Sequence, residues 1–127
     1  MKQYVATTLD VTVMVQPVFL DTQSNAVVKK FVFAYFIRIA NNGTEEVQLQ
    51  RRHWYIKDGD GNTTEVEGEG VVGQRPVIQP GEFHEYNSFC VLETMEGSME
   101  GTYQMKRNHG ELFDAVIPRF SLCAFAN

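Results

Sequence analysis

The chain has 127 residues, and 43% of them are hydrophobic, which is enough for the core of one domain spanning residues 1–127 and excludes a disordered chain. Its formal net charge of -5 argues against a general nucleic-acid binder, which would normally present a basic face. The longest apolar run, residues 31–37, is far shorter than the roughly 20 residues that cross a bilayer, and no apolar secretory signal opens the chain, so we expect a cytoplasmic protein without membrane insertion.

Apolar residues begin to alternate with other residues, with a period of two, close to the N-terminus. A first strand is predicted from Leu9, because apolar residues alternate with other residues as far as Val15. A second apolar stripe occupies alternate positions over residues 31–39, and the intervening Val32 and Ala34 are expected to face away from the core. Residues 41–44 then predict a turn.

The third strand, residues 47–57, changes phase along its length. Val47 and Leu49 share one parity, whereas Trp54 and Ile56 share the other. One extra residue reverses the facing of everything after it, so a β-bulge is predicted near residues 51–53. Residues 58–62 favour a hairpin turn, because Asp, Asn and Gly tolerate positive φ, and a short strand is predicted over residues 63–67.

A GxGxxG string follows, formed by Gly68, Gly70 and Gly73. In a dinucleotide-binding fold this string ends a strand and opens a helix, whose N-terminus holds the pyrophosphate. Here Pro76 and a Pro80-Gly81 turn follow closely, which excludes the first turns of a helix. The string is therefore predicted to be a loop between strands.

Three further strands complete the pattern. They are expected over residues 83–92, around Met99 to Met105, and over residues 113–117, where Pro118 ends the last one. No helical period is present, so the sequence predicts an all-β, antiparallel immunoglobulin-like or fibronectin type III-like β-sandwich. We expect its single tryptophan, Trp54, to be buried between the sheets, with neighbours that include Tyr35, Ile37 and Tyr103.

The acidic hairpin imitates a calcium loop without completing one. Asp58, Asp60 and Asn62 occupy positions 1, 3 and 5 of such a loop, and Glu69 occupies position 12. Position 6 is Thr63, where the sharp EF-hand turn requires glycine, and the flanks read as strands. We therefore predict a polar hairpin tip and no metal site.

The remaining reactive side chains show no catalytic spacing. Cys90 and Cys123 are expected to be reduced thiols in a reducing compartment, and the three histidines lie too far apart for a zinc pattern. Ser88 and Ser98 lack a recognisable histidine partner, and His84 is expected to be partly buried. The sequence predicts no cofactor and no enzyme activity.

Several segments taken together resemble the ApaG family over nearly the whole chain. They are residues 52–58, the glycine string with residues 76–82, and residues 85–88, 97–105 and 113–122. The resemblance implies a fibronectin type III-like sandwich and no established catalytic activity. It also implies a genetic link to cobalt tolerance and magnesium efflux, and a neighbourhood of dinucleoside polyphosphate genes. Similar domains in eukaryotic F-box proteins and in a protein that binds DNA polymerase delta suggest interaction modules.

This chain departs from the family pattern at two places. Arg75 stands where glutamine is expected, which adds a positive charge beside the glycine loop. Residues 89–93 lack a glycine and two prolines that the pattern would place there, which suggests a locally straighter strand.

Our leading hypothesis is a non-enzymatic protein-interaction module whose protein partner the sequence does not name. Its binding surface is expected to be the loop with Gly68, Gly70, Gly73 and Arg75, next to Arg52 and His53. The alternative is a weak binder of pyrophosphate or nucleotide polyphosphate, or a phosphatase, that uses the loop as an anion nest. Open strand edges and the apolar tail, residues 122–126, also allow weak homodimerisation.

Overall fold

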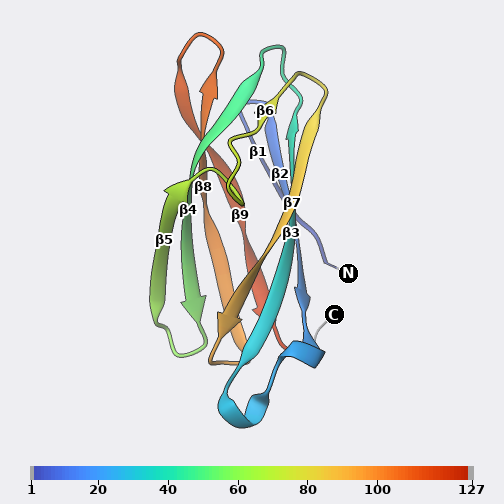
Figure 1. Cartoon of the computed structure of the whole chain (residues 1–127), viewed down its shortest axis with the longest axis vertical. Helices are drawn as coiled ribbons and strands as arrows, with labels where there is room; N and C mark the ends of the chain where they lie inside the picture. The colour runs from blue at the N-terminus through green and yellow to red at the C-terminus, as the bar shows by residue number, and fades with distance from the viewer. Residues whose placement is uncertain (1, 126–127) are drawn as a thin grey trace.

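The chain forms two packed antiparallel sheets in a computed structural model that describes residues 2–125. One sheet has the order β1-β2-β3-β7, and the other has the order β5-β4-β8-β9, with the short β6 paired to β4 (Figure 1). The elements are β1 (Tyr4–Thr8), β2 (Val11–Phe19), η1 (Asp21–Gln23), η2 (Ala26–Val28), β3 (Phe31–Asn41), β4 (Val47–Asp58), β5 (Thr63–Glu69), β6 (Val77–Ile78), β7 (Phe83–Leu92), β8 (Glu96–Arg107) and β9 (Leu112–Cys123). The predicted β-sandwich is confirmed. Over residues 2–125, no helix has the length and apolar character to cross a membrane.

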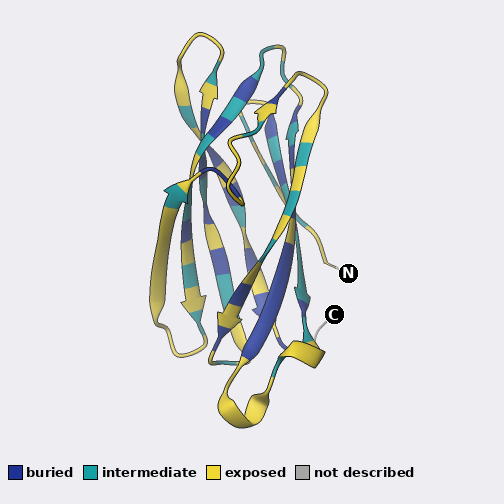
Figure 2. Cartoon of the chain, viewed as in Figure 1, coloured by how far each residue is buried: buried dark blue, intermediate teal, exposed yellow. Residues whose placement is uncertain are grey.

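The core lies between the two sheets and is built by the alternating inward residues that the sequence pattern indicates. Figure 2 shows this alternation as bands of buried and exposed residues along β4, β8 and β9. Trp54 is only 3% exposed, and its ring lies 5.3 Å from that of Tyr35 and 6.3 Å from that of Tyr103. Ile37 is buried in the same core. The predicted burial of Trp54 is thus confirmed, and Phe120, at 6.0 Å, is a further neighbour.

The predicted bulge in β4 is present and accounts for the phase change. The pairing with β8 joins Leu49 to Met105 and then Arg51 to Gln104, so Gln50 is the extra residue. Val47 and Leu49 before the bulge, and Trp54 after it, are consequently all buried. Along the rest of β4, side chains alternate between the core and the outer surface.

Three details of the predicted strands are wrong. Leu9 does not begin a strand, because Leu9 and Asp10 both have positive φ and form the turn of the β1–β2 hairpin. Val32 and Ala34 are buried, although they alternate with the core residues of β3, since η1 contacts β3 and the strand is covered on both faces near its start. Pro118 does not end the last strand.

β9 continues to Cys123 because Pro118 lies in a second bulge. The pairing with β8 joins Gly101 to Ile117 and then Met99 to Phe120, so two residues of β9 oppose one residue of β8. A bulge tolerates proline, since the missing N–H leaves no ladder hydrogen bond unmade. The first two residues of the apolar tail, 122 and 123, are therefore part of the sheet.

The two long sides of the sandwich differ. On one side, β1 and β2 both pack against β9, which closes the sandwich. On the other side, each sheet ends in a strand with one partner, since β5 pairs with β4 and β7 pairs with β3. The open side therefore lies between β5 and β7, where the glycine loop runs from β5 to β6 (Figure 1).

Candidate functional site

The glycine string forms a tight loop and not the start of a helix, as predicted. Gly70 and Gly73 have positive φ, and so does Val72 between them. The N–H of Val71 donates to the carbonyl of Gln74 at 2.8 Å, and the N–H of Gln74 donates back at 2.9 Å. The result is a miniature hairpin whose two central residues are both left-handed, which is the geometry of a type I′ turn.

The side chain of Arg52 fastens this loop to β4. Its Nη1 donates to the carbonyls of Glu69 and Gly70, at 3.1 and 2.9 Å. A Cβ on Gly68 would lie 2.8 Å from the guanidinium, and a Cβ on Gly70 would collide with the carbonyl oxygen of Gln74. Gly70 is thus required for close approach as well as for backbone conformation, whereas Gly68 is constrained only by the Arg52 side chain.

Arg75 and the loop N–H groups are already engaged within the chain. Nη2 of Arg75 lies 2.7 Å from a carboxylate oxygen of Glu69. The N–H of Gly70 donates to the carbonyl of Gln50, and those of Val71 and Gln74 donate to each other's carbonyls. An external anion would therefore compete with these contacts for the groups that the anion-nest hypothesis needs. Gly73, by contrast, lies at the open tip of the turn.

Beneath the loop lies a cleft of about 360 Å³ between the two sheets. Its wall is mostly apolar, and its loop side is supplied by Val71, which is buried, and Val72, which is 67% exposed. The strands β4, β5, β7 and β8 contribute the other apolar groups: Trp54, Ile56, Val66, Phe89 and Met99. Such a cleft, lined by apolar groups with a few polar ones, is the usual form of a binding site.

The polar groups of the cleft are Arg52, Ser88 and tyrosine hydroxyls. The hydroxyls of Tyr86 and Tyr103 hydrogen-bond to each other. Burial raises the pKa of both tyrosines, so both are neutral at physiological pH, and one hydroxyl of the pair donates its proton to the other. Sequence reasoning missed this cleft, because its wall comes from five strands and a loop that only the packing of the two sheets brings together.

His53 lies on the opposite face of β4 from Arg52, because adjacent residues of a strand point to opposite faces. Its Nε2 lies 3.2 Å from a carboxylate oxygen of Glu65, and its Nδ1 lies 3.1 Å from one of Glu67. The imidazole also stacks on Tyr55 at 4.5 Å. The structure thus brings Arg52, Gly68, Gly70 and Arg75 to one loop and excludes His53 from it.

The trio of His53, Glu65 and Glu67 was not foreseen from sequence spacing. One ligand atom from each residue lies within 4.8 Å of the others, which is close enough for a metal ion to gather them. The pairing of β4 with β5, which places Glu67 opposite His53, is what assembles the trio. Both glutamates are exposed, and each has a carboxylate oxygen within hydrogen-bond distance of a different ring nitrogen of His53.

Among the described residues, none of the candidate nucleophiles is hydrogen-bonded to a histidine that could act as its general base. Cys90 is buried, and burial raises the pKa of its thiol to about 11, which keeps it protonated at neutral pH. Ser88 lines the cleft, but His84 lies farther along β7 with Tyr86 between them. His84 is partly buried, as expected, and burial lowers its pKa. Within residues 2–125, no hydrogen bond joins a serine or cysteine side chain to a histidine.

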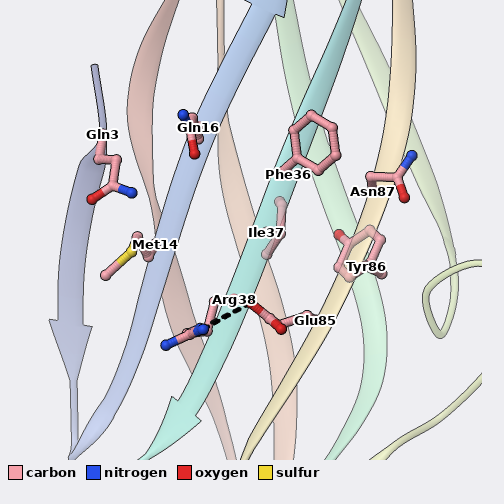
Figure 3. Close-up of a pocket in the computed structure, with 9 residues that line it drawn as sticks. All are labelled: Gln3, Met14, Gln16, Phe36, Ile37, Arg38, Glu85, Tyr86 and Asn87. Atoms are coloured by element: carbon pink, nitrogen blue, oxygen red, sulfur yellow. Dashed lines mark hydrogen bonds and ion pairs between the residues drawn. The ribbon is translucent and has the colours of Figure 1, made fainter. Parts of the chain in front are cut away.

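A second hollow, of about 500 Å³, lies on the outer face of the β1-β2-β3-β7 sheet. Figure 3 shows Phe36 on β3 between Gln16 on β2 and Asn87 on β7. Arg38 and Glu85 form an ion pair at 3.0 Å across its floor. This hollow lies on the outer face of its sheet and contains none of the residues that the sequence proposed as a binding surface.

Comparison with known proteins gives one consistent result. The family model of the ApaG domain matches residues 21–107. Proteins named Protein ApaG from Methylobacterium nodulans and Paramagnetospirillum magneticum are each 50% identical over 119 residues, covering 94% of this chain and 92% of theirs. The crystal structure of the putative ApaA protein from Bordetella pertussis has a TM-score of 0.90 at 42% identity, covering 93% of this chain and 96% of that one. The X-ray structure of the structural-genomics target SoR45 has a TM-score of 0.86 at 40% identity, covering 92% and 89%.

Proposed function

Because this chain belongs to the ApaG domain family, we propose that it is a non-enzymatic interaction module that binds a protein partner at the glycine loop and the cleft beneath it. On this proposal, any role in cobalt tolerance or magnesium efflux is exerted through the bound partner. The binding surface comprises the loop, residues 68–76, and the cleft-facing parts of β4, β5 and β7.

The observation that carries the proposal is the conformation and exposure of Val72. A left-handed backbone costs a β-branched residue roughly 1–2 kcal/mol, and Val72 has φ of +48°. Its side chain is 67% exposed, so burial in this chain does not offset that cost. Backbone strain that no packing contact within the chain offsets is expected at residues that serve binding. Val72 presents an apolar group at the mouth of an apolar cleft.

The apolar surface near Val72 supports the same conclusion. Phe89 and Val91 on β7 are each 58% exposed, and Val66 on β5 is 37% exposed. Val66 and Phe89 line the cleft from its two sheets, and Val91 lies two residues beyond Phe89 among the exposed alternate positions of β7. Exposed apolar groups that gather around a concavity mark interaction sites more often than isolated ones do.

The proposal is tested by cross-linking in the organism that makes the protein. A photoreactive p-benzoylphenylalanine is introduced in place of Val72 and, as the matched control, in place of Val116, which is exposed on the outer face of β9. We expect a discrete protein adduct from position 72 that the change Phe89→Asp removes. The same adducts from both positions would contradict the proposal.

A further inference from the structure

The fold leaves one strand position empty beside β7. β5 packs mainly against β4, and the opposite sheet ends at β7. Thr64, Val66 and Gly68 of β5 pair with Ile56, Trp54 and Arg52, so they share the inner face of their sheet. Val66 is nonetheless 37% exposed. One more strand beside β7 would lie over this face.

The free edge of β7 is suited to accept such a strand. It is ten residues long and pairs with β3 along its other edge. Natural edge strands are commonly protected from pairing by lysine, proline or bulges, and β7 has neither lysine nor proline. The edge strand β5 differs, since it carries three glutamates in seven residues.

The charge inside the cleft indicates one chemical property of the occupant. Arg52 donates Nη1 to two backbone carbonyls, and no ion pair with a carboxylate is found for it within residues 2–125. Its guanidinium lies in a mostly apolar wall, where an unneutralised charge attracts an anion more strongly than it does in water. A carboxylate matches the geometry of a guanidinium.

We propose that an extended segment of the protein partner pairs with the free edge of β7, places alternate apolar side chains in the cleft, and directs one carboxylate to Arg52. This inference rests on the proposed function and adds the chemistry of the partner. Strand addition of this kind obtains affinity from main-chain hydrogen bonds and selectivity from pockets for alternate side chains.

A second copy of this chain would not supply the carboxylate that Arg52 is proposed to bind. If two β7 edges paired, the cleft would receive the inward residues of the other β7. On β7 every second residue is less exposed than its neighbours, and these inward residues are His84, Tyr86, Ser88, Cys90 and Leu92. None of them is acidic, so a second copy would leave Arg52 without a carboxylate.

Synthetic heptapeptides test the chemistry directly. The probe is acetyl-Thr-Val-Thr-Glu-Thr-Val-Thr-amide, in which both valines and the glutamate share one face of an extended chain. Two control peptides carry Gln or Lys in place of Glu. We expect the Glu peptide to bind at least about tenfold more tightly than the Lys peptide, because like charges face each other in the Lys complex.

Protein variants assign that preference to Arg52. Arg52→Gln should abolish it, and Arg52→Lys should retain it. The matched control is Arg38→Gln, an exposed arginine on the outer face of the same sandwich, which should leave the preference unchanged. Thermal melting of each variant shows whether the loop contacts of Arg52 were needed for folding.

Backbone methylation of the peptide provides a second readout that needs no protein variant. N-methylation at one set of alternate amides should abolish binding, while methylation at the other set should be tolerated, because a strand presents alternate amides to its neighbour. Amide exchange along β7 should slow on binding. Equal tolerance of both sets, equal affinity of the Glu and Lys peptides, or no binding at all would each overturn the inference. A cross-linked adduct at position 72 would still support the interaction module in that case.

Discussion

At the scale of single residues, the glycine loop is held by steric requirements that are stronger at some positions than at others. Gly70 has positive φ and no room for a side chain, whereas Gly73 has positive φ and open space beside it. Val72 occupies the same region of backbone space without being glycine. These three positions separate the effect of backbone strain from the effects of packing and of binding.

Val72→Asn should stabilise the fold by about 1 kcal/mol, because asparagine adopts the left-handed conformation more readily than a β-branched residue does. The free energy of unfolding is measured by urea titration. Val116→Asn serves as the control, since Val116 is also exposed but lies in a strand. If both changes lower the stability equally, Val72 is not strained.

Gly70→Ala should lower the free energy of unfolding by more than about 1 kcal/mol, because it combines positive φ with a collision against the carbonyl of Gln74. Gly73→Ala is the matched control and should cost less, since only the φ term applies. Neither protein, nor the unaltered chain, should bind a nicotinamide or flavin dinucleotide saturably at millimolar concentration. Micromolar binding lost in a folded Gly70→Ala variant would restore the dinucleotide hypothesis.

At the scale of elements, alternation was sufficient to locate most strands. The bounds of β7 follow directly from the sequence, because its parity is unbroken from Phe83 to Leu92. The error at Pro118 arose because proline ends a regular strand but is accommodated in a bulge, and sequence does not show where the partner strand is one residue short. The error at Leu9 arose because Leu9 and Asp10 form a left-handed two-residue turn that contains no glycine. The alternation of apolar and polar residues therefore continues through the turn, and the sequence gives no sign of it.

The candidate site was predicted only in part, for a related reason. The sequence located the glycine loop, and the structure places Arg52 and Arg75 beside it. The cleft, the empty position over β5 and the trio around His53 depend on which strands pair and where each sheet stops. Those are properties of the whole topology, which local alternation does not encode.

The two cysteines lie in different elements and should differ in reactivity. Cys90 of β7 is buried and Cys123 at the end of β9 is exposed, and both are free thiols. We expect a thiol probe to label Cys123 much faster than Cys90 at neutral pH. Labelling of Cys90 should accelerate as the pH rises toward its pKa of about 11, because the thiolate is the reactive form. Equal, slow labelling of both thiols in the native protein would count against this.

At the scale of the whole molecule, the C-terminal segment closes one end of the core. The N–H of Ala124 donates to the carbonyl of Met95 at 2.8 Å, and Ala124 is buried. The ring of Phe125 lies 5.0 Å from that of Phe19. The hypothesis that this tail bridges two copies also involved Ala126, which lies outside the described residues. The contacts of Ala124 and Phe125 thus attach this segment to Met95 and Phe19.

Removal of residues 123–127 should therefore lower the melting temperature by several degrees and leave the mass in light scattering unchanged. The lost burial around Ala124 and the lost ring contact account for the lower stability. Ala126→Ser, in the full chain, is a control for changes at the terminus itself. If the full chain is a dimer at high concentration and the shortened chain is a monomer, the tail acts in assembly and the intrachain interpretation is wrong.

The bulge at Gln50 has a consequence for how freely this surface can change. Gln50 is the residue of β4 that has no counterpart on β8, and its carbonyl is the one that accepts the N–H of Gly70. The loop is thus tied to a residue that the β4–β8 ladder does not use. Deleting Gln50 would leave Leu49, Arg52 and Trp54 on the faces they occupy now, because the extra residue is what interrupts an otherwise regular alternation. The hydrogen bond from Gly70 can therefore change without disturbing the β4–β8 ladder, whereas Val71, buried in the core, and Arg52, which holds Glu69 and Gly70, tie the rest of the loop to the sandwich.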